Sequence, residues 1–268
     1  IQKGNYEGRN FRFGVREHAM GSIVNGIMVH KGFRPYCATF LVFSDYMRPA
    51  VRMAALMKLP VVYVFTHDSI YVGEDGPTHE PVEHVEALRI IPGLKVIRPA
   101  DEEETKAAWI KAMENTEGPT ALILTRQGLP LLEKENVVDG VNRGGYVLKD
   151  NSNPNIVLMA SGSEVSLAVE VAGLLEGKDK ACRVVSVPER EDFIAQGDEY
   201  IEEITGAYDQ FKVVIEAGIG TGWYRLLGKD YHVVSIDTFG ESGPGNEVGE
   251  YFGFTAEKIA GDILEKLK

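Results

Sequence analysis

Residues 61–83 read Val-Val-Tyr-Val-Phe-Thr-His-Asp-Ser-Ile-Tyr-Val-Gly-Glu-Asp-Gly-Pro-Thr-His-Glu-Pro-Val-Glu. The first five residues are apolar and either β-branched or aromatic, which predicts a buried strand. The polar remainder holds two histidines, two glycines and several acids, and we interpret it as a loop because a packed core does not favour that composition. Since ligands of open α/β sheets bind outside the carboxyl ends of strands, we expect a functional site in this loop.

Apolar runs of strand length alternate with segments of helical periodicity on both sides of this loop. In the first half of the chain the predicted strands are 36–39, 61–66, 95–98 and 120–125. The predicted helices are 20–28, 48–57 and 82–91, with Pro49 at the effective start of the second. Asp101 and Glu104 mark the start of a further helix. This alternation indicates βαβ units on a mostly parallel sheet.

The periodicity breaks between positions 128 and 154, where prolines, glycines and charged residues gather, and we predict a linker over 131–154. Alternation then resumes, with predicted strands at 156–160, 183–187, 213–216 and 233–236 and predicted helices at 164–175 and 256–267. We therefore predict an α/β fold of two doubly wound domains with mostly parallel sheets, one in residues 1–130 and one in residues 155–268.

Composition and charge exclude several classes of protein. The 268-residue chain has a net charge of −12, which argues against a nucleic-acid partner because phosphate binding needs basic patches. Its apolar runs are strand-sized, so we expect no membrane span, and its first residues show no secretory signal pattern. Cys37 and Cys182 lie in separate strand-like runs without metal-ligand spacing, so we expect reduced structural thiols and a cytoplasmic location.

The loop at 66–83 resembles the signature loop of transketolases. The match continues, in the family's order, through Phe13-Gly-Val-Arg-Glu-His-Ala-Met20, Thr39-Phe-Leu-Val-Phe-Ser-Asp-Tyr46, Leu124-Thr-Arg-Gln127 and Thr238-Phe-Gly-Glu-Ser242. The resemblance implies that residues 1–130 form the domain that binds the pyrimidine ring of thiamine diphosphate, without its first strand and helix. It also implies that residues 155–268 form the transketolase C-terminal domain.

Glu17 lies where a predicted helix begins, and by itself it fits a carboxylate that stabilises the positive end of the helix dipole. The resemblance implies a catalytic and cofactor-binding role instead, in which Glu17 hydrogen-bonds the aminopyrimidine ring of the cofactor. That ring nitrogen must stay protonated for the cofactor to be activated, and a partly desolvated carboxyl group can hold the proton.

Phe40, Phe43 and Tyr46 follow a predicted strand at a spacing of three residues. Such spacing is typical of one apolar face of a turn and helix, which contributes burial alone. In the family these positions surround the pyrimidine ring, with Phe43 stacked on it, and the two interpretations are compatible.

The remaining candidates surround the acidic glycine loop or follow a buried strand. By resemblance, His67 and Arg126 bind the sugar phosphate, and a guanidinium fork suits that group. Asp75 contacts a sugar hydroxyl, and His79 is catalytic, contacting the oxygen on which charge develops during attack on the ketose carbonyl. Other acids of the loop shape it or its dimer contacts, and other histidines are expected to be structural or solvated: Glu74, Glu80, His18, His30, His84 and His232.

Two motifs invite other functions. Gly218-Ile-Gly-Thr-Gly222 suggests dinucleotide binding, but Trp223 stands where the third glycine of that motif belongs, so we expect a structural loop. The run Ala160-Ser-Gly-Ser163 lacks the pattern of a hydrolase nucleophile elbow.

Transketolases hold the diphosphate and a Mg²⁺ or Ca²⁺ ion on an N-terminal domain through a Gly-Asp-Gly segment that this sequence does not contain. We therefore assign no metal ligands here and expect an N-terminal diphosphate-binding domain or chain as a partner, in a homodimer. The chain is expected to be the C-terminal part of a longer enzyme and inactive alone, since a naturally split subunit would keep the opening strand.

The implied reaction is transfer of a two-carbon ketol unit from a ketose phosphate to an aldose phosphate, in the pentose phosphate pathway. A dihydroxyacetone synthase-like ketol transferase is the alternative, whereas a deoxyxylulose phosphate synthase is disfavoured because its glutamate motif differs from Val15-Arg-Glu-His18. A non-catalytic assembly subunit with this fold also remains, although it would not need the five polar candidates Glu17, His67, Asp75, His79 and Arg126 together.

Overall fold

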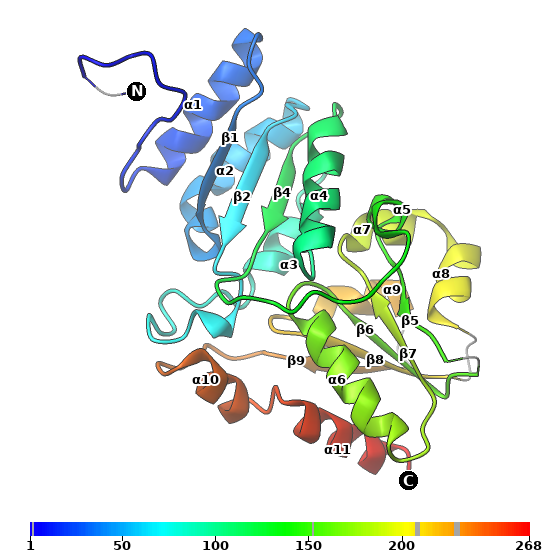
Figure 1. Ribbon diagram of the computed structural model, residues 1–268. Helices are drawn as coiled ribbons and strands as arrows, with labels where there is room; N and C mark the ends of the chain where they lie inside the picture. Colours follow the sequence, from blue (N-terminus) through cyan, green and yellow to red (C-terminus); the bar gives the residue numbers. More distant parts are fainter. Residues whose placement is uncertain (2, 152, 207–209, 228–230) are drawn as a thin grey trace.

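The computed structural model describes residues 1, 3–151, 153–206, 210–227 and 231–268. These residues form two sheets, each with helices on both faces (Figure 1). All strand pairs are parallel except one, which confirms the predicted α/β class.

The first sheet has four parallel strands in the order β1-β2-β4-β3, namely β1 (Tyr36–Phe40), β2 (Val62–Thr66), β3 (Lys95–Ile97) and β4 (Thr120–Ile123). Its helices are α1 (Glu17–His30), α2 (Ser44–Leu56), α3 (His84–Arg89) and α4 (Glu102–Glu114). Tyr63 and Phe65 pack against α1, α2 and α3, whereas Val64 and Leu122 pack against α4. The central strands β2 and β4 are covered on both faces and are therefore almost entirely apolar. The predicted ends of all four strands are accurate to within two residues.

The second sheet has five strands in the order β5-β7-β6-β8-β9, namely β5 (Tyr146–Lys149), β6 (Ile156–Ala160), β7 (Cys182–Ser186), β8 (Phe211–Glu216) and β9 (Tyr231–Ser235). Its helices are α6 (Glu164–Glu176), α7 (Arg190–Ala195), α8 (Asp198–Thr205), α9 (Tyr224–Leu227), α10 (Gly245–Tyr251) and α11 (Ala256–Lys266). Leu158 and Ile215 pack with α6 and α11 on one face, while Met159 and Val214 pack with Phe193 on the other.

The predicted start of α2 at Pro49 is wrong. A 3-10 turn over Leu41–Phe43 leads directly into the helix, which begins at Ser44, so that Pro49 lies inside it. Pro49 lacks the N–H that would bond to the Asp45 carbonyl, but the helix has already been started by the preceding turn and continues on the packing of its buried face. By contrast, α4 begins as predicted, because the carboxylate of Asp101 accepts the Glu104 N–H at 3.1 Å.

The segment predicted as a linker is folded over much of its length. It contains α5 (Val137–Arg143) and β5, which pairs antiparallel with β7; position 152 lies outside the described residues. Val141 of α5 packs under the first sheet, while β5 extends the second sheet. Both elements are too short for their periodicity to stand out in the sequence.

The loop after β2 is clamped against the second domain. Ile70 and Val82 belong to the apolar cluster formed mainly by α6, β6 and α11. Gly73 has a positive φ of 81°, and a Cβ there would lie 3.0 Å from the carbonyl oxygen of Gly243. Figure 1 shows this loop, drawn in cyan, beside α10. The loop is therefore shaped by both domains.

The two cysteines are free and buried, as predicted. Burial raises the pKa of Cys37 to about 12 and that of Cys182 to about 11, so both thiols remain protonated at neutral pH. Among the helices that the structure describes, none is both long enough and apolar enough to cross a bilayer.

Candidate active site

Three adjacent strands of the first sheet bring the candidate residues to one edge. Phe40 ends β1 and is paired in register with Thr66, which ends β2. The Leu124 N–H, just after β4, donates to the Phe65 carbonyl at 2.8 Å. Because the strands are parallel, Phe40, His67 and Arg126 emerge at the same carboxyl edge, where the sequence predicted a site.

The aromatic candidates form a stacked row with one open end. The ring centroids of Phe40 and Phe43 are 5.9 Å apart, and those of Phe43 and Tyr46 are 6.0 Å apart. Leu41 and Met47 from the same segment are fully buried, whereas Tyr46 is 63 % exposed. The helical spacing thus directs Leu41 and Met47 into the core and leaves the aromatic row outside it.

His67 lies at the centre of the polar candidates. Its ring stacks on Phe40 with centroids 3.6 Å apart, and its Nδ1 lies 2.9 Å from the Thr66 hydroxyl. Burial lowers the pKa of His67, as does the Arg126 guanidinium, while Asp75 acts in the opposite direction. The imidazole is therefore neutral at pH 7.

His79 joins the same group from the far side of the loop. Its ring meets Phe43 edge-on with centroids 5.6 Å apart, and its Nδ1 lies 2.9 Å from the Thr78 hydroxyl. The turn that returns the chain is closed by the His79 N–H donating to the Gly76 carbonyl at 2.9 Å. Gly76 has a positive φ of 75°, which an L side chain rarely adopts.

Glu17 is the first residue of α1 and is partly buried. One turn later, Gly21 packs against Met47 and Ala50 of α2, and the Asn25 side-chain amide donates to the Ala50 carbonyl at 2.8 Å. Glu17 lies on this face at the end of the α1–α2 interface. Within the described part of the chain its carboxylate makes no hydrogen bond or ion pair, and the structure gives it no direct contact with the aromatic row.

These residues fit one end of thiamine diphosphate. A stacked aromatic row and a carboxylate without a protein partner suit an aminopyrimidine ring, which needs a flat apolar face and a hydrogen-bond acceptor that can carry a proton. The candidate edge offers Arg126 for a phosphate group. Among the described residues, Asp45, Glu83 and His84 gather their potential metal-ligand atoms within 4.8 Å of one another, and Asp45 directly precedes the last residue of the aromatic row. The aromatic row and Glu17 themselves fit the pyrimidine end of the cofactor.

Sequence reasoning missed two residues beneath this edge. Asp68 is 2 % exposed and Arg98 is 1 % exposed, and they form an ion pair directly under His67. The available signal was an arginine immediately after a buried strand. His84, expected to be structural, is buried with its Nε2 3.2 Å from Asp45 Oδ2, which fits that expectation.

The Gly218–Gly222 loop is a close contact between domains. The Ile219 N–H donates to the Val82 carbonyl at 3.0 Å, and a Cβ on Gly218 would lie 2.8 Å from that same oxygen. Trp223 is fully buried. These contacts are the packing that the predicted structural role requires.

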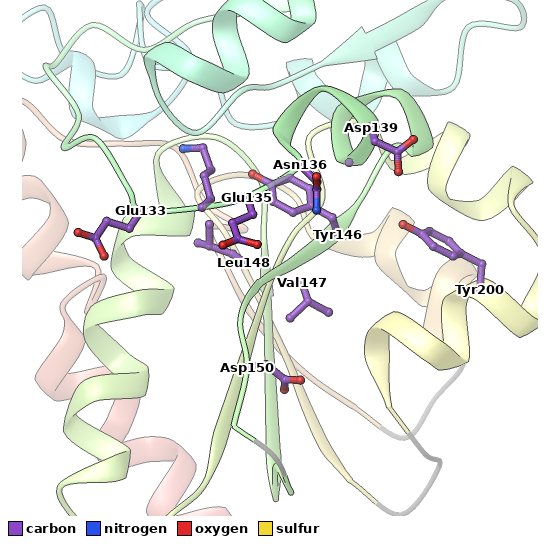
Figure 2. A pocket seen from close by; sticks show the side chains of 11 residues that line it. Glu133, Glu135, Asn136, Asp139, Tyr146, Val147, Leu148, Asp150 and Tyr200 are labelled. Carbon is purple, nitrogen blue, oxygen red and sulfur yellow. The ribbon is translucent and has the colours of Figure 1, made fainter.

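One cavity lies away from the candidate site. It has a volume of about 510 Å³ and opens between α5, β5 and α8 (Figure 2). Glu133, Glu135, Asp139 and Asp150 give its lining an acidic character, and none of the candidate site residues lines it. A second cavity of about 360 Å³ borders residues 127–130, next to Arg126, and reaches α6 and α10.

Two family models match the chain. The model for the transketolase pyrimidine binding domain matches residues 2–130, and the model for the transketolase-like C-terminal domain matches residues 144–255. A transketolase of Halalkalibacterium halodurans is 52 % identical over 262 residues, which are 97 % of this chain and 39 % of that protein. A transketolase of Aquifex aeolicus is 48 % identical, over 97 % of this chain and 38 % of its own length. The chain thus spans about two fifths of the length of these relatives.

Solved structures show the same relation. A transketolase of Campylobacter jejuni superposes with a TM-score of 0.90 at 41 % identity, over 97 % of this chain and 40 % of that one. A transketolase of Pichia stipitis in complex with sedoheptulose-7-phosphate superposes with a TM-score of 0.91 at 40 % identity, over 98 % of this chain and 38 % of that one. The fold, the order of the motifs and both family models agree that this chain belongs to the transketolase family, of which it carries the pyrimidine-binding and C-terminal domains.

Proposed function

We propose that this chain is the C-terminal part of a transketolase that transfers a two-carbon ketol unit from a ketose phosphate to an aldose phosphate. The observation that supports this most directly is the gathering of the aromatic row, His67, His79 and Arg126 at one carboxyl edge of a transketolase pyrimidine-binding domain. The assignment of residues 1–130 to the pyrimidine-binding domain belongs to the same proposal, as do a cytoplasmic location and the pentose phosphate pathway. The C-terminal domain starts ahead of residue 155, because β5 is part of its sheet.

Each residue has a defined task in this proposal. Phe40, Phe43 and Tyr46 hold the pyrimidine ring, and Glu17 holds a proton on its ring nitrogen. Thiamine diphosphate, when bound, supplies the nucleophile that attacks the ketose carbonyl. His79 donates a hydrogen bond to the oxygen that becomes negatively charged.

Substrate recognition falls to three polar residues. Arg126 and the neutral His67 bind the sugar phosphate, the first through charge and the second as a hydrogen-bond donor. Asp75 accepts a hydrogen bond from a sugar hydroxyl and so selects the configuration at that carbon. The clustering of these charges around His67 supports the assignment.

We further propose that an N-terminal diphosphate-binding domain or chain completes the site, with Mg²⁺ or Ca²⁺, in a homodimer. This follows from the fit of the aromatic row and Glu17 to the pyrimidine end of the cofactor. A structure described as an inactive β4 tetramer of a split-gene transketolase has a chain with the same fold over 83 % of its length, at 24 % identity. A non-catalytic assembly subunit with this fold is the second candidate function for this chain.

The test uses the complete polypeptide, or this chain with an N-terminal diphosphate-binding domain supplied, together with thiamine diphosphate and Mg²⁺. Ketol transfer from phosphorylated ketoses is expected, and a screen of acceptors distinguishes transketolase from a dihydroxyacetone synthase-like enzyme. The 268-residue chain alone is expected to be inactive and to bind the cofactor at roughly millimolar Kd in calorimetry, because stacking and one hydrogen bond contribute a few kcal/mol. Micromolar affinity of the chain alone would contradict this division of the site.

A single variant tests the phosphate role. Arg126→Ala is expected to raise KM for phosphorylated substrates about 10- to 100-fold and to leave unphosphorylated substrates within about twofold, since a charged hydrogen bond contributes about 1.5–3 kcal/mol. Arg225→Ala removes an exposed guanidinium of the second domain and serves as the control. Equal losses for both substrate classes would exclude a phosphate-binding role for Arg126.

A further inference from the structure

The carboxyl edge of the second sheet has a crevice of the kind that holds ligands in other α/β proteins. The chain leaves β6 toward β7 on one side, and β8 lies on the other, so the strand order reverses between β6 and β8. Ligands of open α/β sheets bind at such a reversal point. Here the position is filled by a side chain of the first domain, the guanidinium of Arg98.

Arg98 follows β3 and is held by groups at the ends of β6 and β8. Its Nη1 donates to the Ser161 carbonyl at 3.0 Å, and its Nη2 donates to Glu164 Oε1 at 3.2 Å. Glu216, which ends β8, has its Oε1 3.4 Å from Nη1. The side chains of Arg98, Glu164 and Glu216 are all at most 2 % exposed, so water does not weaken these contacts.

The acidic groups are fixed from their own domain. Glu164 Oε2 accepts the Ala217 N–H at 3.0 Å, and Glu216 Oε2 accepts the Trp223 indole N–H at 2.8 Å. Arg89 adds a second buried cation, with its Nη1 3.4 Å from Glu216 Oε1. The second domain therefore presents a rigid, anionic socket to Arg98.

The other side of the Arg98 guanidinium holds Asp68. Arg98 Nε and Arg98 Nη2 lie 2.8 and 2.7 Å, respectively, from a single oxygen, Asp68 Oδ2. Asp68 directly follows His67, whose φ is +60°, a strained conformation that non-glycine residues rarely adopt. Such a residue persists only when its surroundings fix it. Here Thr66 is fixed on one side by pairing with β1, and Asp68 is fixed on the other side by Arg98.

We propose that Arg98 and Glu164 are positioning residues for the candidate active site: the second domain holds His67 in its binding conformation through the contacts Glu164–Arg98–Asp68, and thereby sets the affinity for the substrate phosphate. The inference deepens the proposed function, since its consequence for substrate rests on His67 binding the sugar phosphate. It gives the C-terminal domain, which contributes none of the candidate residues, a defined role in the site.

The test compares Glu164→Gln with Glu86→Gln in the complete polypeptide. Both substitutions remove one carboxylate charge from an ion pair between the domains. Glu86 pairs with Arg190, with Oε2 2.6 Å from Nη1, and this pair shares no hydrogen-bond partner with Arg98 among the described residues. Glu86→Gln therefore controls for a weakened interface in general. Arg98→Lys, which keeps the charge but cannot reach Asp68 and Glu164 together, is the second variant should Glu164→Gln not fold.

Two readouts separate this inference from the function on which it rests. Hydrogen exchange read by mass spectrometry on peptides covering 66–72 is expected to speed up about tenfold in Glu164→Gln and to stay unchanged in Glu86→Gln, because only the first loses the anchor of Asp68. In steady-state kinetics, Glu164→Gln is expected to raise KM for phosphorylated substrates about tenfold with kcat within about twofold.

The outcomes are distinct. Unchanged exchange over 66–72 in Glu164→Gln and Arg98→Lys overturns the positioning role, whatever the kinetics. Faster exchange with equal losses for phosphorylated and unphosphorylated substrates overturns the link to phosphate affinity, and Arg126→Ala then shows independently whether the phosphate site itself is misassigned. If Glu164→Gln and Glu86→Gln change hydrogen exchange and KM equally, both residues act only by stabilising the contact between the domains. That outcome would also overturn the inference.

Discussion

The two sheets are built alike but use their carboxyl edges differently. The edge of the first sheet presents partly exposed rings and charges, among them Phe40, His67 and Arg126. The corresponding edge of the second sheet is buried and holds Glu164 and Glu216 against an arginine from the first domain. The same architecture thus presents the candidate site in the first domain, whereas in the second domain its carboxyl edge binds a side chain of the first domain.

Two arginines on neighbouring strands make the contrast sharper. Arg126 follows β4 and is exposed, whereas Arg98 follows β3, pairs with carboxylates on both sides and is 1 % exposed. The chemical group is identical, and its surroundings decide whether it is available to a ligand. A strand-end arginine in an α/β sequence is therefore ambiguous until its burial is known.

The largest effect is expected at the first edge. In the complete enzyme, Glu17→Gln should lower kcat about 10²–10⁴-fold, because an amide cannot exchange the proton that an acid–base group supplies. Thiamine diphosphate binding, measured by calorimetry, should remain within a few-fold of wild type. Glu114→Gln, which removes an exposed acid at the end of α4, is the control. Turnover of Glu17→Gln near the wild-type value would show that Glu17 is not the residue that supplies the catalytic proton.

The next largest effect is expected where Arg98 contacts the second domain. Arg98→Met should lower the free energy of unfolding of the 268-residue chain by about 3–5 kcal/mol, because Asp68 and Glu164 are left buried without their cation. Arg126→Met, its counterpart on the exposed edge, should change the same quantity by no more than about 0.5 kcal/mol. Urea unfolding of the three proteins measures both values. Similar losses for the two variants would show that the two edges do not differ as the structure indicates.

The smallest effect concerns Glu80, which lies where the two edges meet. Its side chain is 2 % exposed and lies against Gly240, and burial raises its pKa from 4.5 to about 7. The folded state then holds a proton that the unfolded state releases above pH 4.5, so stability is full below that pH and is lost as the pH rises through 7.

Glu80→Gln should therefore match the wild-type stability near pH 4.5 and exceed it by about 3 kcal/mol at pH 8, since one pKa unit corresponds to about 1.4 kcal/mol. Thermal or urea unfolding at a series of pH values provides the measurement. Glu74→Gln removes an exposed carboxylate from the same loop and should keep the wild-type pH profile. A Glu80→Gln profile with the wild-type slope would show that Glu80 is not buried as a protonated acid.

Much of the fold follows from local patterns. Strands covered on both faces, such as β2 and β6, are apolar throughout, so their ends could be predicted from composition alone. Short or irregular elements could not: α5 and β5 depend on packing against two different sheets, and α2 continues through Pro49 because an earlier turn starts the helix. For the same reason the candidate residues at strand ends were visible in the sequence, while their mutual arrangement was not.

The sequence by itself determined the α/β class and the position of the polar loop after β2, because both depend on neighbours a few positions away. The set of candidate residues came from the resemblance of the sequence motifs to those of transketolases. Only the tertiary structure decided the role of Asp68, whose partner Arg98 is 30 positions distant and whose anchor Glu164 is a further 66 positions from Arg98. Charges paired across such separations carry no local pattern. Their effect arises from burial, which removes the water that would otherwise weaken the attraction and is a property of the folded chain alone.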